Sequence, residues 1–176
     1  MSNTHRTAIA AACLAAIAAA GAGHAATLER DDYESGARAC QGATAGFAAV
    51  LRARPLAVAN VGDGTAFITC AWSGREGIGS TRRLQEVKLT LINRAEVARS
   101  VSCTFVHGIA VAPVDQIGYV TRSVEIAPGQ SAALTFTQAD VTQWKQQLSH
   151  PQISCAAPPL VEVASLGTWY VEEVGQ

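Results

Sequence analysis

The stretch LAVANVGDGTAFITCAW, residues 56–72, carries the strongest fold signal in this 176-residue chain. Residues 56–60 have the alternation of a strand, the Gly-Asp-Gly segment at 62–64 supplies turn residues, and residues 66–72 are rich in β-forming side chains. Two such runs separated by glycine, aspartate and asparagine are typical of a β-hairpin. The stretch therefore predicts antiparallel β structure.

A second copy of this pattern follows 33 residues later, because LTLINRAEVARSVSCTF (89–105) aligns with the first stretch without a gap. Asn60 aligns with Asn93 and Cys70 aligns with Cys103, so each asparagine precedes its cysteine by ten residues. The other matched pairs are Leu56 with Leu89, Val58 with Leu91, Ile68 with Val101, Thr69 with Ser102 and Trp72 with Phe105. We interpret the two stretches as a structural pseudo-repeat, with coincidence between two amphipathic hairpins as the alternative.

The alternation of residues in each copy predicts which face of its cysteine-bearing strand is buried. Every other residue of a strand points to the same face, so the cysteine shares its face with the apolar residues two places away on either side. We expect that face to form the core. The asparagine stands where the first strand of each copy ends, and its side chain can bond to the backbone there in an Asx-turn.

The rest of the chain is predicted to form further short strands and one helix. Residues 117–126 and 131–137 flank an Ala-Pro-Gly-Gln segment whose Pro-Gly centre indicates a type II turn, so another hairpin is predicted. Residues 140–148 (DVTQWKQQL) are the one convincing helical segment. Additional short β runs cover 152–156, 160–164 and 168–174. The sequence thus predicts an all-β, antiparallel β-sandwich of about nine short strands with one short helix.

The asparagine turns resemble those of bacterial immunoglobulin-like sandwiches over roughly residues 48–136. This resemblance implies an immunoglobulin-like β-sandwich. The cysteine spacing departs from that of antibody domains, so no functional residue is carried across. We expect a single β-sandwich domain over 47–176, preceded by a polar, loosely structured lead-in over 26–46.

The N-terminal segment predicts export. A short n-region ends at Arg6, an Ala/Ile/Leu-rich run follows, and Gly23 and Ala25 fit positions −3 and −1 of a cleavage site. The apolar run is shorter than the about 20 residues that a spanning helix needs. We therefore expect residues 1–25 to be a cleaved signal peptide, no membrane span, and a secreted or periplasmic protein. A lipid anchor on Cys13 is a weaker alternative, because almost no apolar segment precedes that cysteine.

Four cysteines remain after this cleavage, and an even count in an oxidising compartment indicates two disulfides. We favour Cys40–Cys70, which would tie the N-terminal lead-in to the first repeated hairpin, and Cys103–Cys155, because the Ile-Ser-Cys that ends at Cys155 resembles the Val-Ser-Cys that ends at Cys103. A bond between Cys70 and Cys103 is the main alternative. No Cys-x-x-Cys occurs, which argues against a metal site.

Charge and motifs limit the functional classes. Of 13 Lys and Arg residues, Arg6 leaves with the signal peptide, so 12 remain against 14 Asp and Glu, a net charge of −2. A nearly neutral chain argues against nucleic-acid binding. The glycine clusters at 62–64 and 77–79 lack the helix and lysine of a phosphate-binding loop, so no cofactor is predicted.

No catalytic residue is predicted. His107 and His150 are the only histidines left after cleavage, and neither a Gly-x-Ser-x-Gly nor a Ser-x-x-Lys motif is present. The acidic pairs at 31–32 and 172–173 are neighbours in sequence, which point opposite ways on a strand. They are better explained as solvated charges than as a glycosidase pair.

Two features suggest binding. The segment 73–83 is predicted to be a long surface loop that carries Arg75, Arg82 and Arg83. These arginines could contact an anionic partner or the edge of a protein. Its alternative is a solvated connection.

The other feature is the dipeptide Trp169-Tyr170, which puts one ring on each face of a strand. An exposed ring there could anchor a carbohydrate or a protein. We favour the simpler reading of a core Trp169 beside an amphipathic edge tyrosine.

These observations predict an exported, disulfide-bonded β-sandwich with a non-catalytic binding or structural role in the envelope or extracellular space. Its partner would be an unidentified protein or glycan. The alternatives are a hydrolase that uses Asp or Glu in a cleft between the sheets, and an enzyme inhibitor that inserts the loop at 73–83.

Overall fold

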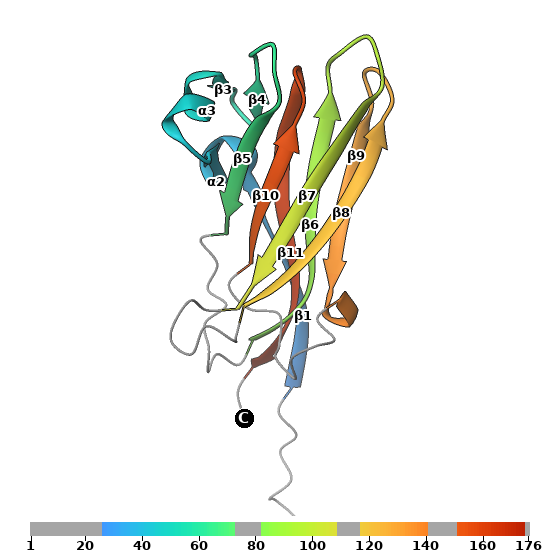
Figure 1. Cartoon of the computed structure of the whole chain (residues 1–176). Coiled ribbons are helices and arrows are strands. Elements are labelled where there is room, and N and C mark those ends of the chain that lie inside the picture. Colours follow the sequence, from blue (N-terminus) through green and yellow to red (C-terminus); the bar gives the residue numbers. More distant parts are fainter. Residues whose placement is uncertain (1–25, 73–81, 109–116, 141–150, 175–176) are drawn as a thin grey trace, which may run out of the picture.

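The computed structural model describes residues 26–72, 82–108, 117–140 and 151–174, which form two antiparallel sheets packed face to face (Figure 1). The predicted all-β sandwich is confirmed. Within those ranges, no helix has the length and apolar character needed to cross a membrane. The predicted helix over 140–148 lies outside the described residues except for Asp140, which ends a short 3-10 helix, η2.

Sheet A has six strands in the order β3-β4-β11-β6-β9, with β1 also paired to β11. Sheet B has five strands in the order β2-β5-β10-β7-β8. The strands of sheet A are β1 (Ala26–Ser35), β3 (Leu51–Ala53), β4 (Val58–Asn60), β6 (Arg82–Asn93), β9 (Ser131–Thr137) and β11 (Val161–Val174). Those of sheet B are β2 (Cys40–Gly42), β5 (Ala66–Ala71), β7 (Arg99–His107), β8 (Gly118–Ile126) and β10 (Gln152–Ala157). The short helices are α2 (Gly36–Ala39), α3 (Ala45–Ala49) and η2 (Gln138–Asp140).

The strands pair in a nested order. β7 pairs with β8, β6 with β9, β5 with β10, and β4 with β11. Nested pairs wound across two sheets give a jelly roll, so the winding differs from the immunoglobulin-like order that the asparagine turns suggested. The last strand, β11, is longer than predicted. β11 has 14 residues, because it continues through Ser165–Gly167, where the sequence suggested a break.

The predicted hairpins are instead arches that cross between the sheets. β4 leads from sheet A to β5 in sheet B, and β6 leads to β7 in the same way. The Pro-Gly turn at 128–129 joins β8 in sheet B to β9 in sheet A. Turn residues between two β runs locate the turn correctly, but they do not decide whether the second strand returns to the same sheet.

Asn60 and Asn93 are fully buried and join the arches to one another. The Oδ1 atom of Asn60 accepts a hydrogen bond from the N–H of Gly62 at 3.0 Å, and that of Asn93 accepts from Ala95 at 2.9 Å. These are the predicted Asx-turns. Each Nδ2 also donates, at 2.8 to 2.9 Å, to the carbonyl four residues on and to one in a neighbouring arch: Gly64 and Ala157 for Asn60, Val97 and Ile126 for Asn93. The two copies therefore share their bonding as well as their sequence.

Both favoured disulfides are present, and both lie within sheet B. Cys40 is bonded to Cys70, its direct partner between β2 and β5. Cys103 is bonded to Cys155, its direct partner between β7 and β10. Cys70, Cys103 and Cys155 are buried in the core cluster, as the alternation predicted. The two bonds link four of the five strands of this sheet into two covalent pairs.

The segment 26–46 is ordered, which corrects the prediction of a loosely structured lead-in. Its first part is β1, whose ten residues pair with β11 from Ala26↔Val174 to Ser35↔Ser165. Eight of those ten residues are exposed. β1 contributes backbone pairing rather than core burial, and a search for apolar alternation does not detect such a strand.

Candidate functional site

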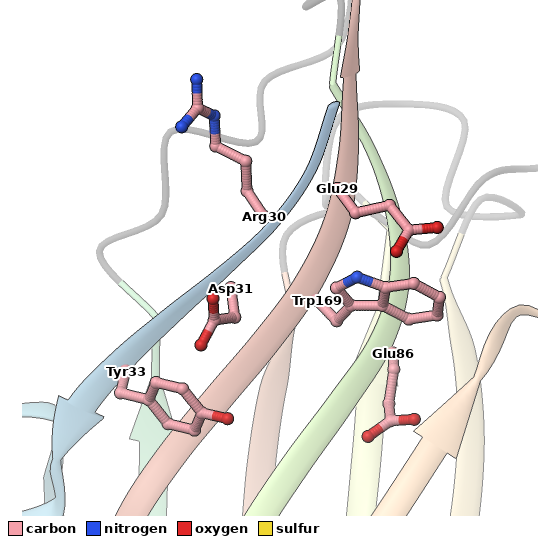
Figure 2. Close-up of a pocket in the computed structure, with 6 residues that line it drawn as sticks. All are labelled: Glu29, Arg30, Asp31, Tyr33, Glu86 and Trp169. Atoms are coloured by element: carbon pink, nitrogen blue, oxygen red, sulfur yellow. The ribbon is translucent and has the colours of Figure 1, made fainter. Parts of the chain in front are cut away.

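An open pocket of about 450 Å³ lies on the outer face of sheet A, where β1, β11 and β6 run side by side (Figure 2). The residues that line it come from all three strands: Glu29, Arg30, Asp31, Tyr33, Glu86 and Trp169. We call this set the aromatic-acidic surface.

Trp169 is the apolar centre of the aromatic-acidic surface. Its side chain is 39 % exposed, whereas Thr168 and Tyr170 on either side of it are 3 % and 7 % exposed. The structure therefore reverses the sequence-based expectation, which placed the tryptophan inside and the tyrosine at the edge. Apolar residues occur at both alternating sets of positions in this strand, so the sequence does not fix which set faces the core.

Two carboxylates flank the indole across the sheet. Asp31 of β1 is the direct partner of Trp169, and Trp169 is the direct partner of Glu86 of β6. In a regular ladder such as that of β1 and β11, direct partners on one face have Cβ atoms about 4.5–5.5 Å apart, whereas the pairing of β11 with β6 has an irregularity directly after Trp169. Figure 2 shows the carboxylates of Glu29 and Glu86 above and below the indole in that view. The ring is thus surrounded by hydrogen-bond acceptors.

Tyr33 adds a second aromatic ring, and its side chain is 63 % exposed. It lies opposite Gly167 of β11. A Cβ atom at position 167 would stand 2.7 Å from Cε1 and 3.0 Å from Cδ1 of the tyrosine. The ring rests against the β11 backbone only because residue 167 has no side chain. Gly167 therefore sets the position of Tyr33 beside Trp169.

Arg30 contributes less to the pocket than its carboxylate neighbours. Its Nε atom lies 2.7 Å from Oε2 of Glu172, and Figure 2 shows the guanidinium on the far side of β1 from the indole. No group of three His, Cys, Asp or Glu side chains is placed to hold a metal ion in the described ranges. The surface presents aromatic faces and hydrogen-bond acceptors on three paired strands.

The sequence analysis did not select Glu29, Asp31 or Tyr33 as a group. They follow one another at every second position of β1, which is the available local signal. Their pairing with β11 joins the two ends of the described chain, and no local pattern indicates that pairing.

The structure describes two of the three arginines that the sequence analysis selected. Arg82 and Arg83 begin β6 instead of ending a loop. Val171 of β11 pairs with Arg83 on one side and with Glu29 on the other. The backbone of Arg83 therefore lies beside the aromatic-acidic surface. Arg75 and His150 lie outside the described residues. A partner-binding role for the three arginines stays a prediction.

His107 lies in the core at the end of β7 and is 2 % exposed. Its ring stacks on Phe105 with a centroid distance of 5.7 Å, and it fills the space beside Gly118. Burial lowers the pKa of His107 below its ordinary value. The residue is positioned to pack between the sheets and does not line the pocket.

The buried His107 is expected to make stability depend on pH. The unfolded chain protonates this histidine near pH 6.5, whereas the folded chain resists protonation. The contribution of neutral His107 to the free energy of unfolding is therefore fully present above pH 6.5. It falls by at most about 1.4 kcal/mol per pH unit below that pH, until the lower folded-state pKa is reached. Urea unfolding between pH 8 and pH 5 should show a smaller loss in His107→Leu than in the wild type. Equal losses in the two proteins would contradict this assignment.

Among the described residues, Glu162 is the one buried carboxylate, and it does not lie between the sheets. Glu162 is 3 % exposed, but alternation with its core neighbours in β11 places it on the outer face of sheet A. Its carboxylate lies 2.9 Å from Nε of Arg54 and 3.0 Å from Nε of Arg94. This buried carboxylate is therefore held in an ion-pair cluster.

Comparison with known proteins finds likeness of architecture only. No family model matches the chain, and no curated protein matches it. An exo-β-1,3-galactanase from Phanerochaete chrysosporium is similar over 79 % of this chain at 12 % identity and a TM-score of 0.41, and the match spans only 29 % of the galactanase. A carbohydrate-binding module of a family 9 glycoside hydrolase (Cel9A) from Ruminococcus flavefaciens matches 53 % of this chain and 73 % of its own, at 12 % identity and a TM-score of 0.37. The coat protein of Tobacco streak virus matches 85 % and 89 %, at 11 % identity and a TM-score of 0.40. Scores of this size carry no inference about function.

Proposed function

We propose that this protein is an exported, non-catalytic glycan-binding protein and that its aromatic-acidic surface is the binding site. The observation that carries the proposal is the exposed indole of Trp169, set among the carboxylates of Glu29, Asp31 and Glu86 and beside the ring of Tyr33.

The chemistry of this surface suits a sugar. The ring face of an aromatic side chain packs on the apolar C–H face of a pyranose, and carboxylate oxygens accept hydrogen bonds from its hydroxyl groups. The pocket is open rather than enclosed, so it can admit an internal stretch of a longer chain as well as its end. These properties favour an extended glycan over a small buried ligand.

The strands also hold the site in place before a ligand arrives. β11 carries the indole and is paired with β1 on one side and β6 on the other. The backbone of paired strands is already fixed, so binding need not order it, which lowers the entropic cost of association.

The exposure of the acidic residues favours binding over hydrolysis. Glycoside hydrolysis needs one carboxyl group that stays protonated in a dry environment near the bond to be cleaved. Glu29 and Asp31 are instead exposed on an open sheet surface. The two disulfides support the proposed export, because such bonds persist in oxidising compartments.

A retention assay tests the proposal. The disulfide-bonded protein is mixed with insoluble neutral polysaccharides, namely β-1,3-glucan, β-1,4-glucan, xylan and chitin, and bound protein is measured. We expect retention on at least one of them, and a loss of affinity of about tenfold or more in Trp169→Ala, because stacking and burial of the indole contribute about 1.5 kcal/mol or more.

Tyr119→Ala is the matched control. Tyr119 is 68 % exposed, but it belongs to β8 of sheet B. Its removal is expected to leave retention unchanged. The proposal fails if no polysaccharide retains the protein, or if Trp169→Ala and the wild type are retained equally.

Gly167→Ala is expected to weaken glycan binding without removing any group that contacts the glycan. The new methyl group would displace the ring of Tyr33 from β11 and cost about three- to tenfold in affinity, the value of one aromatic contact. Tyr33→Ala should give a similar loss, and the double variant should lose little more than either single variant. Additive losses would show that Gly167 does not act through Tyr33.

A further inference from the structure

β1 has one edge that no described strand covers. It pairs with β11 over all ten of its residues, and sheet A contains no strand on its other side within the described ranges. The backbone N–H and C=O groups of a strand are directed to its two sides, so part of those of β1 point away from β11. No second strand among the described residues pairs with this side of β1.

This edge lacks most of the features that usually prevent strand addition. Such features are proline, charged side chains, a bulge, a short strand or a covering element, and within the described ranges β1 has only the charges. The sequence of β1, ATLERDDYES, has neither proline nor lysine. Its register with β11 is continuous from end to end, and eight of its ten residues are exposed. Among the described residues, the edge is therefore open to an added strand.

Charge makes this open edge selective. Glu29, Asp31, Asp32 and Glu34 stand against one Arg30, so the strand carries a net charge of 1 − 4 = −3. Arg30 is paired with Glu172 of the neighbouring β11. Two copies of β1 side by side would bring like charges together, which opposes pairing between copies of this chain. A strand rich in Lys or Arg would meet opposite charges at the same positions.

We propose that the free edge of β1 accepts a basic, extended segment of a partner protein as an added β-strand. Backbone hydrogen bonds supply the affinity, and basic side chains at alternate positions meet Asp32 and Glu34, which alternation places on the face of β1 opposite to Glu29 and Asp31. This site is the edge of sheet A. The proposed glycan site is the outer face of the same sheet, and neither proposal depends on the other.

Three capped dodecapeptides and the disulfide-bonded protein test this inference. The first alternates Lys and Val, the second Glu and Val, and the third Lys and Pro. Lys-Pro keeps the charge and spacing of the first peptide, but proline lacks the N–H donor and disfavours a paired strand. Binding is followed by amide NMR of the protein, and the hydrogen-exchange rates of residues 26–35 are read at saturation.

We expect only the Lys-Val peptide to bind, with the largest shifts and new exchange protection within residues 26–35. The double variant Asp32→Lys/Glu34→Lys should weaken that binding about tenfold and allow the Glu-Val peptide to bind. Glu96→Lys/Glu125→Lys changes the charge equally at exposed positions outside β1 and should leave both results unchanged.

Equal binding of Lys-Val and Lys-Pro would show simple charge attraction and overturn the proposal. Equal binding of Lys-Val and Glu-Val, no binding at all, or shifts centred outside β1 would overturn it as well. A concentration-dependent dimer with protected β1 amides would show that a second copy of the chain occupies the edge, and this too would contradict the proposal.

Discussion

Asn93→Ala is expected to lower the free energy of unfolding by about 3–5 kcal/mol. The side chain is fully buried and donates to the carbonyls of Val97 and Ile126 while it accepts from the N–H of Ala95. Alanine would leave the carbonyl of Ile126 and the N–H of Ala95 buried without a partner, at about 1–3 kcal/mol for each group, and would remove the part-buried bond to Val97 at a smaller cost. Urea unfolding with the disulfides intact measures the loss.

Two further variants show whether this loss reflects the arch network. Val97→Ala lies in the same arch, but its side chain is 55 % exposed, so a change within about 0.5 kcal/mol is expected. Asn60→Ala removes the equivalent bonds to Gly64 and Ala157 and should cost as much as Asn93→Ala. A loss below about 1 kcal/mol in both asparagine variants would contradict the role assigned to the network.

Removal of the Cys103–Cys155 bond is expected to cost about 4 kcal/mol. The bond spans 52 residues, and the chain-entropy model gives about this value for a loop of that length. The same model gives about 3.5 kcal/mol for Cys40–Cys70, which spans 30 residues. The paired variants Cys103→Ala/Cys155→Ala and Cys40→Ala/Cys70→Ala therefore both shift urea unfolding to lower concentration.

Both disulfide variants should still fold. A chain of this length buries enough surface to form a core without covalent links. Far-ultraviolet circular dichroism should therefore retain the β signature in both. Loss of that signature at neutral pH would show that the disulfides are required for folding. No change in the urea midpoint would show that the unfolded chain is not restricted by them.

The strands and turns of the core could be predicted because they depend on local pattern. The repeated Asn-to-Cys spacing located both Asx-turns, and the echo of Val-Ser-Cys in Ile-Ser-Cys identified β7 and β10 as neighbours with a shared disulfide. Sheet membership could not be predicted in the same way. Whether β5 returns beside β4 or crosses to the other sheet depends on pairing with β10, which lies far along the chain.

The candidate site was less predictable than the core. Trp169-Tyr170 was recognised as one inward and one outward ring, but which ring faced outward depends on a register that apolar residues on both faces leave open. Tyr33 and Asp31 lie in a segment without apolar alternation. They become part of a surface only because β1 pairs with β11, and that contact joins residues more than a hundred positions apart.

Calorimetric titration with a soluble oligosaccharide of the retained glycan tests the central claim most directly, with mass analysis of the sugar after each run. The aromatic-acidic surface predicts saturable binding to the wild type, binding at least about tenfold weaker to Trp169→Ala, and an oligosaccharide of unchanged mass. Equal affinities for the two proteins would contradict the assigned site, and shortened oligosaccharides would contradict a non-catalytic role.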